Sequence, residues 1–222
     1  MEGALDDTIC AVATPAGEGG IGIVRISGSA ALSVARKVVR LRSNQSLEKT
    51  SSHTLHLADV LSASTLSTES LPVQTEYNDR VIDEGFVVYM KAPRSFTAED
   101  VVEIHCHGSL IVLKRVCEAC LAAGARMAEP GEFTKRAFLN GRLDLSQAEA
   151  VLDTIKAKSE LGLKQAQRQL RGELGQMVDQ LRTRLIGLLA RIEAGIDFSE
   201  EDLTFIGSQE LILSLQKTLD DI

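Results

Sequence analysis

Apolar residues recur every three or four positions from Leu163 to Ile192, and this regular stripe constrains the fold more than any other feature of the sequence. The stripe consists of Leu163, Ala166, Leu170, Leu174, Met177, Leu181, Leu185, Leu188 and Ile192. Such spacing predicts one long amphipathic helix, and a helix with an apolar face of this length is typical of a bundle.

Capping signals predict further helices on either side of this stripe. Ser146-Gln-Ala-Glu149 has the pattern of a capping box, and Ser159 offers a second N-cap before the stripe begins. After an acidic bend at residues 197–202, a last stripe from Leu211 to Ile222 predicts another helix. We therefore predict an all-α helical-bundle domain over residues 129–222.

The first part of the chain mixes strand-like and helix-like patterns. Strands are expected at residues 8–13, 22–26, 53–60, 86–90 and 101–105, and helices at residues 31–39 and 109–123. A glycine-rich turn joins the first two strands, and Ser29 is the expected N-cap of the first helix. This mixture predicts an α+β domain over residues 1–128.

Charge and composition exclude several classes of function. The formal net charge of -7 argues against a chain that holds nucleic acid by simple counterion release. No apolar run approaches the roughly 20 residues that a membrane span needs, and the N-terminus lacks the pattern of a signal peptide. The four cysteines are unevenly spread, which favours free thiols in a reducing compartment. We expect a cytoplasmic protein that does not contact membranes.

Two weak patterns favour a structural interpretation. The segment Gly17–Gly22 matches the dinucleotide-binding pattern GxGxxG, but it leads into a predicted strand and not into a helix. Strand alternation separates Glu103, His105 and His107 from Cys106, and the downstream cysteines fall among core positions of a predicted helix. We therefore predict core thiols and no metal site.

Catalytic motifs are missing from the sequence. No serine lies in a recognisable nucleophile pattern, so acyl transfer is not supported. No Gly-Lys pair occurs, and a P-loop therefore cannot be formed. We predict that this chain alone neither binds nor hydrolyses GTP and holds no catalytic residue of its own.

Three charged residues are candidates for ligand contacts. Glu103 lies in an otherwise apolar strand, where a buried carboxylate needs hydrogen-bond donors. Arg25 interrupts the apolar run 21–27, and a guanidinium suits a bidentate contact with a carboxylate, a phosphate or a polar ring edge. Arg142 lies in a turn before a predicted helix. An edge-strand glutamate that faces water, or one that pairs with a neighbouring lysine or arginine, explains Glu103 equally well. A structural salt bridge explains Arg25 at least as well as a ligand contact does.

A series of ordered motifs between Asp7 and Glu201 resembles the MnmE/TrmE family of tRNA modification GTPases. The motifs include Thr14-Pro to Gly28, Ser95-Phe-Thr-Ala-Glu-Asp100, Pro130-Gly-Glu-Phe-Thr134, Leu143-Asp-Leu-Ser-Gln-Ala-Glu149 and Ala194-Gly-Ile-Asp-Phe198. Each motif alone would be weak, but their order and spacing make the match specific.

The resemblance implies an aminomethyltransferase-like folate-binding fold that forms a homodimer, followed by a helical domain that a G domain interrupts. Such proteins work with an FAD-containing partner of the MnmG/GidA type. Together they add an aminomethyl or carboxymethylaminomethyl group at C5 of the wobble uridine of tRNA, with a one-carbon unit from 5-formyl- or 5,10-methylene-tetrahydrofolate. GTP, Mg²⁺ and K⁺ would bind only through the G domain, before which we expect this chain to be cut.

Matched motif by motif, the family's folate-site residues fall on Arg25, Glu103 and Arg142. The family usually has lysine at the position of Arg142, and glycine at those of Ala98 and Ser109. Two other classes of protein stay open: a stand-alone folate-dependent aminomethyltransferase, and a non-catalytic dimerisation or scaffold module. Folate binding by the chain would distinguish the scaffold from the other two.

Overall fold

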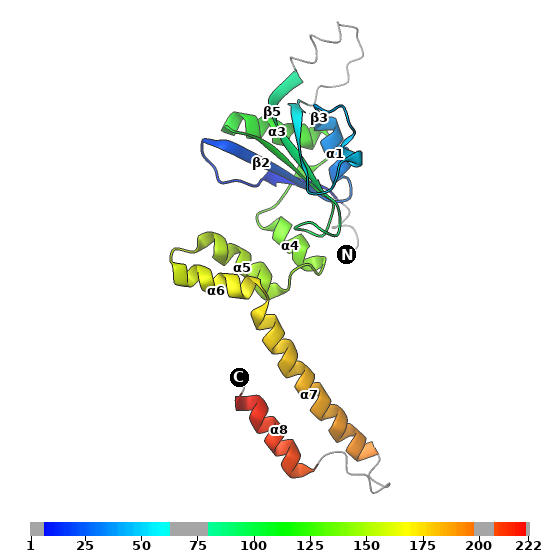
Figure 1. Cartoon of the computed structure of the whole chain (residues 1–222), viewed down its shortest axis with the longest axis vertical. Coiled ribbons are helices and arrows are strands. Elements are labelled where there is room, and N and C mark those ends of the chain that lie inside the picture. Colours follow the sequence, from blue (N-terminus) through cyan, green and yellow to red (C-terminus); the bar gives the residue numbers. More distant parts are fainter. Residues whose placement is uncertain (1–6, 63–79, 198–206, 221–222) are drawn as a thin grey trace. The chain divides into compact units, whose positions relative to one another are not determined.

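The computed structural model describes residues 7–62, 80–197 and 207–220 (Figure 1). Packing divides the chain into a first unit, Met1–Leu143, and a second unit, Asp144–Ile222. The predicted domains, 1–128 and 129–222, differ from these units in the placement of helix α4 (Glu132–Leu139). The turn signals at Pro130 mark the start of α4, whereas the packing changes only after the turn that follows this helix.

A mixed sheet forms the centre of the first unit. Its strands are β1 (Ile9–Val12), β2 (Gly19–Ser27), β3 (Val39–Leu41), β4 (Leu55–Leu61), β5 (Val81–Met90), β6 (Val101–Gly108) and β7 (Arg126–Met127). They lie in the order β3-β4-β5-β6-β2-β1-β7, and the described pairs are antiparallel except for β1 with β7. The five predicted strands are confirmed. The short strands β3 and β7 were not predicted, because two or three residues carry no readable alternation.

Helices α1 (Ala31–Val38) and α3 (Leu110–Ala122) pack against the sheet and enclose the core with it (Figure 1). Val24 and Ile26 of β2 and Ile104 of β6 lie in this core. Because successive side chains of a strand point to opposite faces, Arg25 and Glu103 lie on the other face of the sheet. The strand register therefore places the two candidate residues outside the helix-covered core.

The start of α1 corrects one prediction. Its N-cap is Ala30 and not Ser29, and no side chain caps the helix from that position. The amide of Ala30 donates instead to Thr8 Oγ1 at 2.9 Å. A residue distant in sequence thus satisfies the helix terminus, which local capping rules do not detect.

All four cysteines are buried free thiols of the first unit: Cys10, Cys106, Cys117 and Cys120. Burial raises the pKa of Cys106 and of Cys117 to about 11, so these thiols stay protonated at neutral pH. They are core residues, as their positions in the sequence predicted. Within the described ranges, no group of three or more His, Cys, Asp and Glu side chains is arranged to hold a metal ion.

The second unit is all-helical. It consists of α5 (Leu145–Lys156), α6 (Glu160–Leu170), α7 (Glu173–Asp197) and α8 (Ser208–Asp220) in its described part. Helix α5 packs on α6, α6 contacts α7, and α8 lies along α7 (Figure 1). An α+β unit followed by a helical unit confirms the predicted fold class at this level. None of the helices in the described residues is long and apolar enough to cross a lipid bilayer.

Two predictions for the helices were wrong. The capping box of α5 uses Asp144 and Gln147, two residues earlier than the predicted Ser146 and Glu149. The predicted single helix through residues 163–192 is broken after Leu170, where Gly172 has a φ of +78°. The predicted cap at Ser159 is confirmed, since its Oγ accepts from the amide of Gly162 at 3.1 Å. The predicted acidic bend lies outside the described residues beyond Asp197.

Candidate functional site

Arg25 and Glu103 form an ion pair on the face of the sheet opposite α1 and α3. They are directly paired positions of the antiparallel strands β2 and β6. Arg25 Nε and Nη2 each lie 2.7 Å from Glu103 Oε1. The side chains are 26% and 15% exposed, so the pair is shielded from water in part and remains partly accessible. The structure thus brings together two of the three predicted site residues.

Two aromatic rings flank the guanidinium of Arg25. Its Cζ lies 5.5 Å from the ring centroid of Phe96 and 5.6 Å from that of Phe133. Contacts of a cation with aromatic faces at this distance are attractive, and more so when water is partly excluded. Phe96 comes from the segment between β5 and β6, and Phe133 from the first turn of α4. The ion pair therefore stands between a loop and a helix that both contribute apolar surface.

The second oxygen of Glu103 makes only a weak contact. Glu103 Oε2 lies 3.4 Å from His105 Nε2, beyond the usual range for a strong hydrogen bond. Each carboxylate oxygen can accept two hydrogen bonds, so Oε2 keeps capacity for a further donor. A ligand with an N–H edge could bind there without displacing Arg25.

The segment that carries Phe96 is anchored to the C-terminal end of strand β2. Ser27 Oγ lies 2.7 Å from both Thr97 Oγ1 and Glu99 Oε2. Ser95 Oγ donates to the carbonyl of Glu99, which closes the loop on itself. These bonds use Ser27, the residue of β2 that lies two positions beyond Arg25 on the same face. The strand that supplies the cation thereby also holds the loop.

Ala98, at the tip of this loop, adopts a φ of +61°. This is the left-handed region, in which a residue with a Cβ costs roughly 1–2 kcal/mol relative to the right-handed conformation. The position is one of the two at which the sequence departs from the glycine that is usual in the family it resembles. The backbone of the loop therefore explains the preference for glycine.

Replacement of Ala98 by glycine is expected to stabilise the first unit by about 0.5–1 kcal/mol, since relief of the left-handed strain outweighs the greater entropy of the unfolded glycine chain. Urea unfolding followed by tyrosine fluorescence measures this, because both tyrosines of the sequence, Tyr77 and Tyr89, precede residue 143, where the first unit ends, and the sequence has no tryptophan. Ala122→Gly, at an exposed position of helix α3, is the control and is expected to destabilise slightly, because glycine is less favourable than alanine in a helix. An unchanged or lower unfolding midpoint for Ala98→Gly would contradict the account of strain.

Arg142 reaches the same loop from the turn after α4. Its Nε donates to the carbonyl of Ser95 at 3.2 Å, and the side chain is otherwise exposed. Nearby, Asn140 Nδ2 donates to the carbonyl of Thr97 at 2.7 Å. The structure connects Arg142 to the Arg25–Glu103 pair through the loop residues 95–97, with no direct bond to either member of the pair among the described contacts.

An ion network around the buried Arg136 contacts the loop through Glu99. Arg136 of α4 is only 2% exposed, and its guanidinium contacts Asp7, Glu99 and Glu132. Arg126 of β7 pairs with the same Glu132 at 2.6 Å and with Asp7. Burial disfavours the charge of Arg136, but hydrogen bonds with Asp7 and Glu132 outweigh this and raise its pKa. The network ties the residues before β1, the loop and α4 into one assembly.

The hydrogen bond from Arg126 lowers the pKa of Glu132 from 4.5 to about 2. A carboxyl group with a depressed pKa stabilises the folded state above its ordinary pKa and loses that contribution as the pH falls. We expect the unfolding free energy of the first unit to decrease between about pH 4.5 and pH 2 by about 2 kcal/mol, less than the full shift because Arg126 is half-exposed. Glu132→Gln is expected to flatten this dependence, and an equal slope in both proteins would contradict the assignment.

Sequence reasoning missed Phe96, Phe133 and Arg136 as members of the site. Both phenylalanines lie inside recognisable Phe-Thr motifs, which could have marked them as site residues. That both rings contact the guanidinium of Arg25 becomes apparent only in the folded structure. Arg136 looks like an ordinary charged residue of a helix surface. Its burial depends on the convergence of three acidic residues from separate segments.

Comparisons with known proteins match both units. The family model described as the GTP-binding protein TrmE N-terminus matches residues 8–142, and the one described as the MnmE helical domain matches residues 145–222. The chain is similar to proteins named tRNA modification GTPase MnmE. It is 48% identical over 221 residues to that of Heliobacterium modesticaldum, across 98% of this chain and 45% of the relative. It is 52% identical over 197 residues to that of Moorella thermoacetica, across 89% and 40%. The chain thus spans less than half the length of these relatives.

Proposed function

The chain belongs to the MnmE/TrmE family, and from this premise we propose that it forms the N-terminal part of a tRNA modification GTPase whose first unit binds a reduced folate. The single observation that supports folate binding is the half-buried Arg25–Glu103 pair between two phenylalanine rings. It combines an acceptor for a polar ring edge with apolar faces for a flat ring.

The residues of the site fit a folate in chemical type. Glu103 Oε2 can accept from an N–H edge of a pterin, and Phe96 and Phe133 offer surfaces for stacking. Arg142 is an exposed cation beside the loop, suited to the acidic tail of the ligand. A bound 5-formyl- or 5,10-methylene-tetrahydrofolate would supply the one-carbon unit, while these side chains bind and orient it.

The wider activity follows from the family as a proposal. With an FAD-containing MnmG/GidA-type partner, the full-length protein would add an aminomethyl or carboxymethylaminomethyl group at C5 of the wobble uridine of tRNA in the cytoplasm. GTP, Mg²⁺ and K⁺ would bind a G domain outside these residues, and the first unit would form the homodimer. The chain itself contributes folate binding and contains no P-loop sequence, so we expect no GTP turnover from it.

The experiment that tests folate binding is calorimetric titration of the chain with 5-formyl-tetrahydrofolate. Saturable binding would support the enzyme interpretations, and its absence would favour the scaffold module. A stand-alone aminomethyltransferase is disfavoured because the second unit is helical where such an enzyme would need a second barrel-like domain.

Variants of Arg142 are expected to differ in their effect on this binding. Arg142→Lys restores the usual family residue and keeps the positive charge, so its affinity is expected to stay within roughly 1 kcal/mol of the wild type. Arg142→Glu places a carboxylate beside the acidic tail and is expected to abolish measurable binding. Thermal unfolding of each variant controls for changes in the loop around Ser95. Wild-type affinity in both variants would limit Arg142 to shaping this loop.

A further inference from the structure

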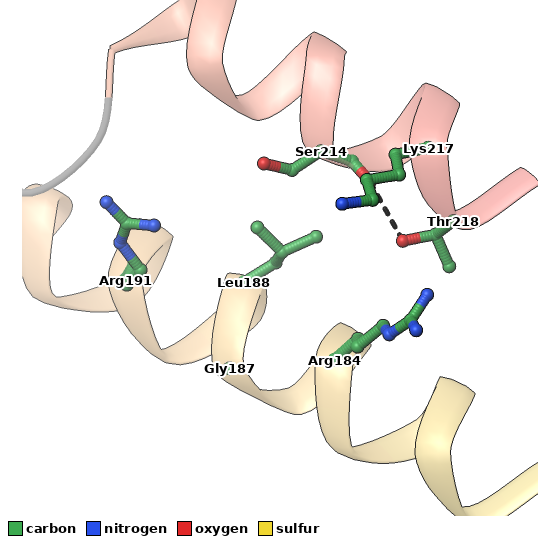
Figure 2. A pocket seen from close by; sticks show the side chains of 7 residues that line it. All are labelled: Arg184, Gly187, Leu188, Arg191, Ser214, Lys217 and Thr218. Carbon is green, nitrogen blue, oxygen red and sulfur yellow. Dashed lines mark hydrogen bonds between the residues drawn. The ribbon is translucent and has the colours of Figure 1, made fainter.

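Polar side chains gather in the second unit as well as on the sheet of the first, but in the second unit the charged ones are already paired. Helices α7 and α8 border a pocket of about 430 Å³ (Figure 2). Arg191 in its lining pairs with Glu210 at 2.8 Å, and Arg184 also has an interaction partner. On the sheet, the second oxygen of Glu103 makes only the 3.4 Å contact with His105 among the described contacts. Free hydrogen-bonding capacity therefore lies at the sheet.

His105 lies beside Glu103 on the same face of β6. Side chains two apart on a strand point the same way, so both lie on the face opposite α1 and α3. The antiparallel pairings place Ile23 of β2 on one side of His105 and Phe86 of β5 on the other. The imidazole is 22% exposed. His105 thus lies between the positions of two apolar residues and is still accessible to a ligand.

Arg25 leaves one carboxylate oxygen of Glu103 for a ligand. Its Nε and Nη2 both lie 2.7 Å from Oε1, and a carboxylate oxygen can accept two hydrogen bonds. Oε2 therefore remains, and the polar atom beside it is His105 Nε2 at 3.4 Å. A ligand group that donates to Oε2 places its own neighbouring atoms next to this ring nitrogen.

The carboxylate of Glu103 favours a proton on Nε2 of His105. A bare Nε2 lone pair facing Oε2 would set two acceptors against each other, whereas an Nε2–H group faces the oxygen favourably. The neutral ring therefore carries its proton on Nε2, and the positively charged ring has one there as well. In both states the site presents an acceptor, Oε2, next to a donor, Nε2–H.

We propose that His105 is a second recognition residue of the folate site, which donates its Nε2–H to a carbonyl oxygen of the ligand. That carbonyl lies next to the N–H group that Glu103 Oε2 accepts. The pterin ring of a reduced folate carries such an edge, N3–H beside the O4 carbonyl, and the order of acceptor and donor on β6 matches it. This role of His105 rests on the folate binding proposed above.

The first test uses the free chain and does not depend on folate. Nitrogen chemical shifts of the His105 imidazole, assigned by comparison with His105→Gln, are expected to show a neutral ring protonated at Nε2 at about pH 8. Glu103→Ala is expected to weaken this preference, because the facing acceptor is removed. A neutral ring protonated at Nδ1 in the unchanged chain would overturn the proposed role.

The second test is calorimetric titration with 5-formyl-tetrahydrofolate. His105→Leu removes the donor and is expected to weaken binding about tenfold, because a carbonyl of the bound ligand loses its partner in a partly desolvated site. His105→Gln keeps an N–H donor and is expected to stay within about threefold of the wild type. His107→Leu is the matched control, since His107 lies two residues further along β6, is 71% exposed and pairs with Asp83. We expect this control to stay within about twofold.

The outcomes separate the role of His105 from folate binding itself. If the wild-type chain binds no 5-formyl-tetrahydrofolate, the proposed folate function fails, and the role of His105 fails with it. If the wild type binds and His105→Leu binds as tightly, folate binding stands and the role of His105 is overturned. Equal weakening by His105→Leu and His105→Gln would also overturn it, because the loss would then come from packing and not from the donor. Thermal unfolding shows whether each variant is folded.

Discussion

Replacement of Glu103 by alanine is expected to weaken binding of 5-formyl-tetrahydrofolate by about 2–4 kcal/mol, because N–H donors of the ligand would lose their acceptor in a partly desolvated site. The loss has a second source in this structure. Glu103 Oε1 holds Arg25 through two contacts of 2.7 Å, so the alanine variant also frees the guanidinium that the phenylalanine rings flank. Calorimetry measures the affinity directly.

Two further variants separate the functional role of Glu103 from a structural one. Glu103→Gln keeps an oxygen acceptor of similar shape but loses the charge that holds Arg25, and we expect an intermediate loss of affinity. Glu84→Ala removes an exposed carboxylate of the neighbouring strand β5, which is paired with Arg42, and is expected to leave binding unchanged. Equal folate affinity in wild type and Glu103→Ala would reduce Glu103 to the structural partner of Arg25.

The sequence could predict the charges at the site but not their pairing. Arg25 and Glu103 each stand out because a charged residue interrupts an apolar strand. Their contact depends on the register between β2 and β6, which is set by tertiary packing and not by either strand alone. Alanine itself gives no local signal for the positive φ of Ala98, and only the glycine that the family resemblance leads one to expect there pointed to it.

The apolar stripe of the second unit shows why a helix boundary was missed. Helices α6 and α7 each keep the spacing of three and four, so the pattern continues across the break between them. The signal for the break was present, since a glycine after a basic residue is typical of a helix C-terminus and Gly172 adopts the left-handed conformation there. Periodicity alone therefore identified the helical character but overestimated the length of the helix.

Removal of the buried guanidinium is expected to have the largest effect on stability. Arg136→Met conserves much of the side-chain volume but removes the ion-pair partner of Glu99 and leaves Glu132 with Arg126 alone, and loss of one partner from a buried ionic group costs about 3–5 kcal/mol. Urea unfolding followed by tyrosine fluorescence measures the resulting change in the unfolding free energy of the first unit. Because the network anchors Glu99, which accepts from Ser27, we also expect the loop that carries Phe96 to loosen.

Arg126→Met is the matched control for Arg136→Met. Arg126 pairs with the same two carboxylates, Asp7 and Glu132, but its side chain is 44% exposed. Water can replace much of the hydrogen bonding that Arg126 provides, so we expect the unfolding free energy to fall by about 1 kcal/mol. Equal decreases in unfolding free energy for the two variants would show that burial of the arginine does not determine how strongly the network stabilises the fold. If Arg136→Met instead gained stability, the three acidic residues would have to be satisfied by other donors, and the network would not be what joins α4 to the sheet.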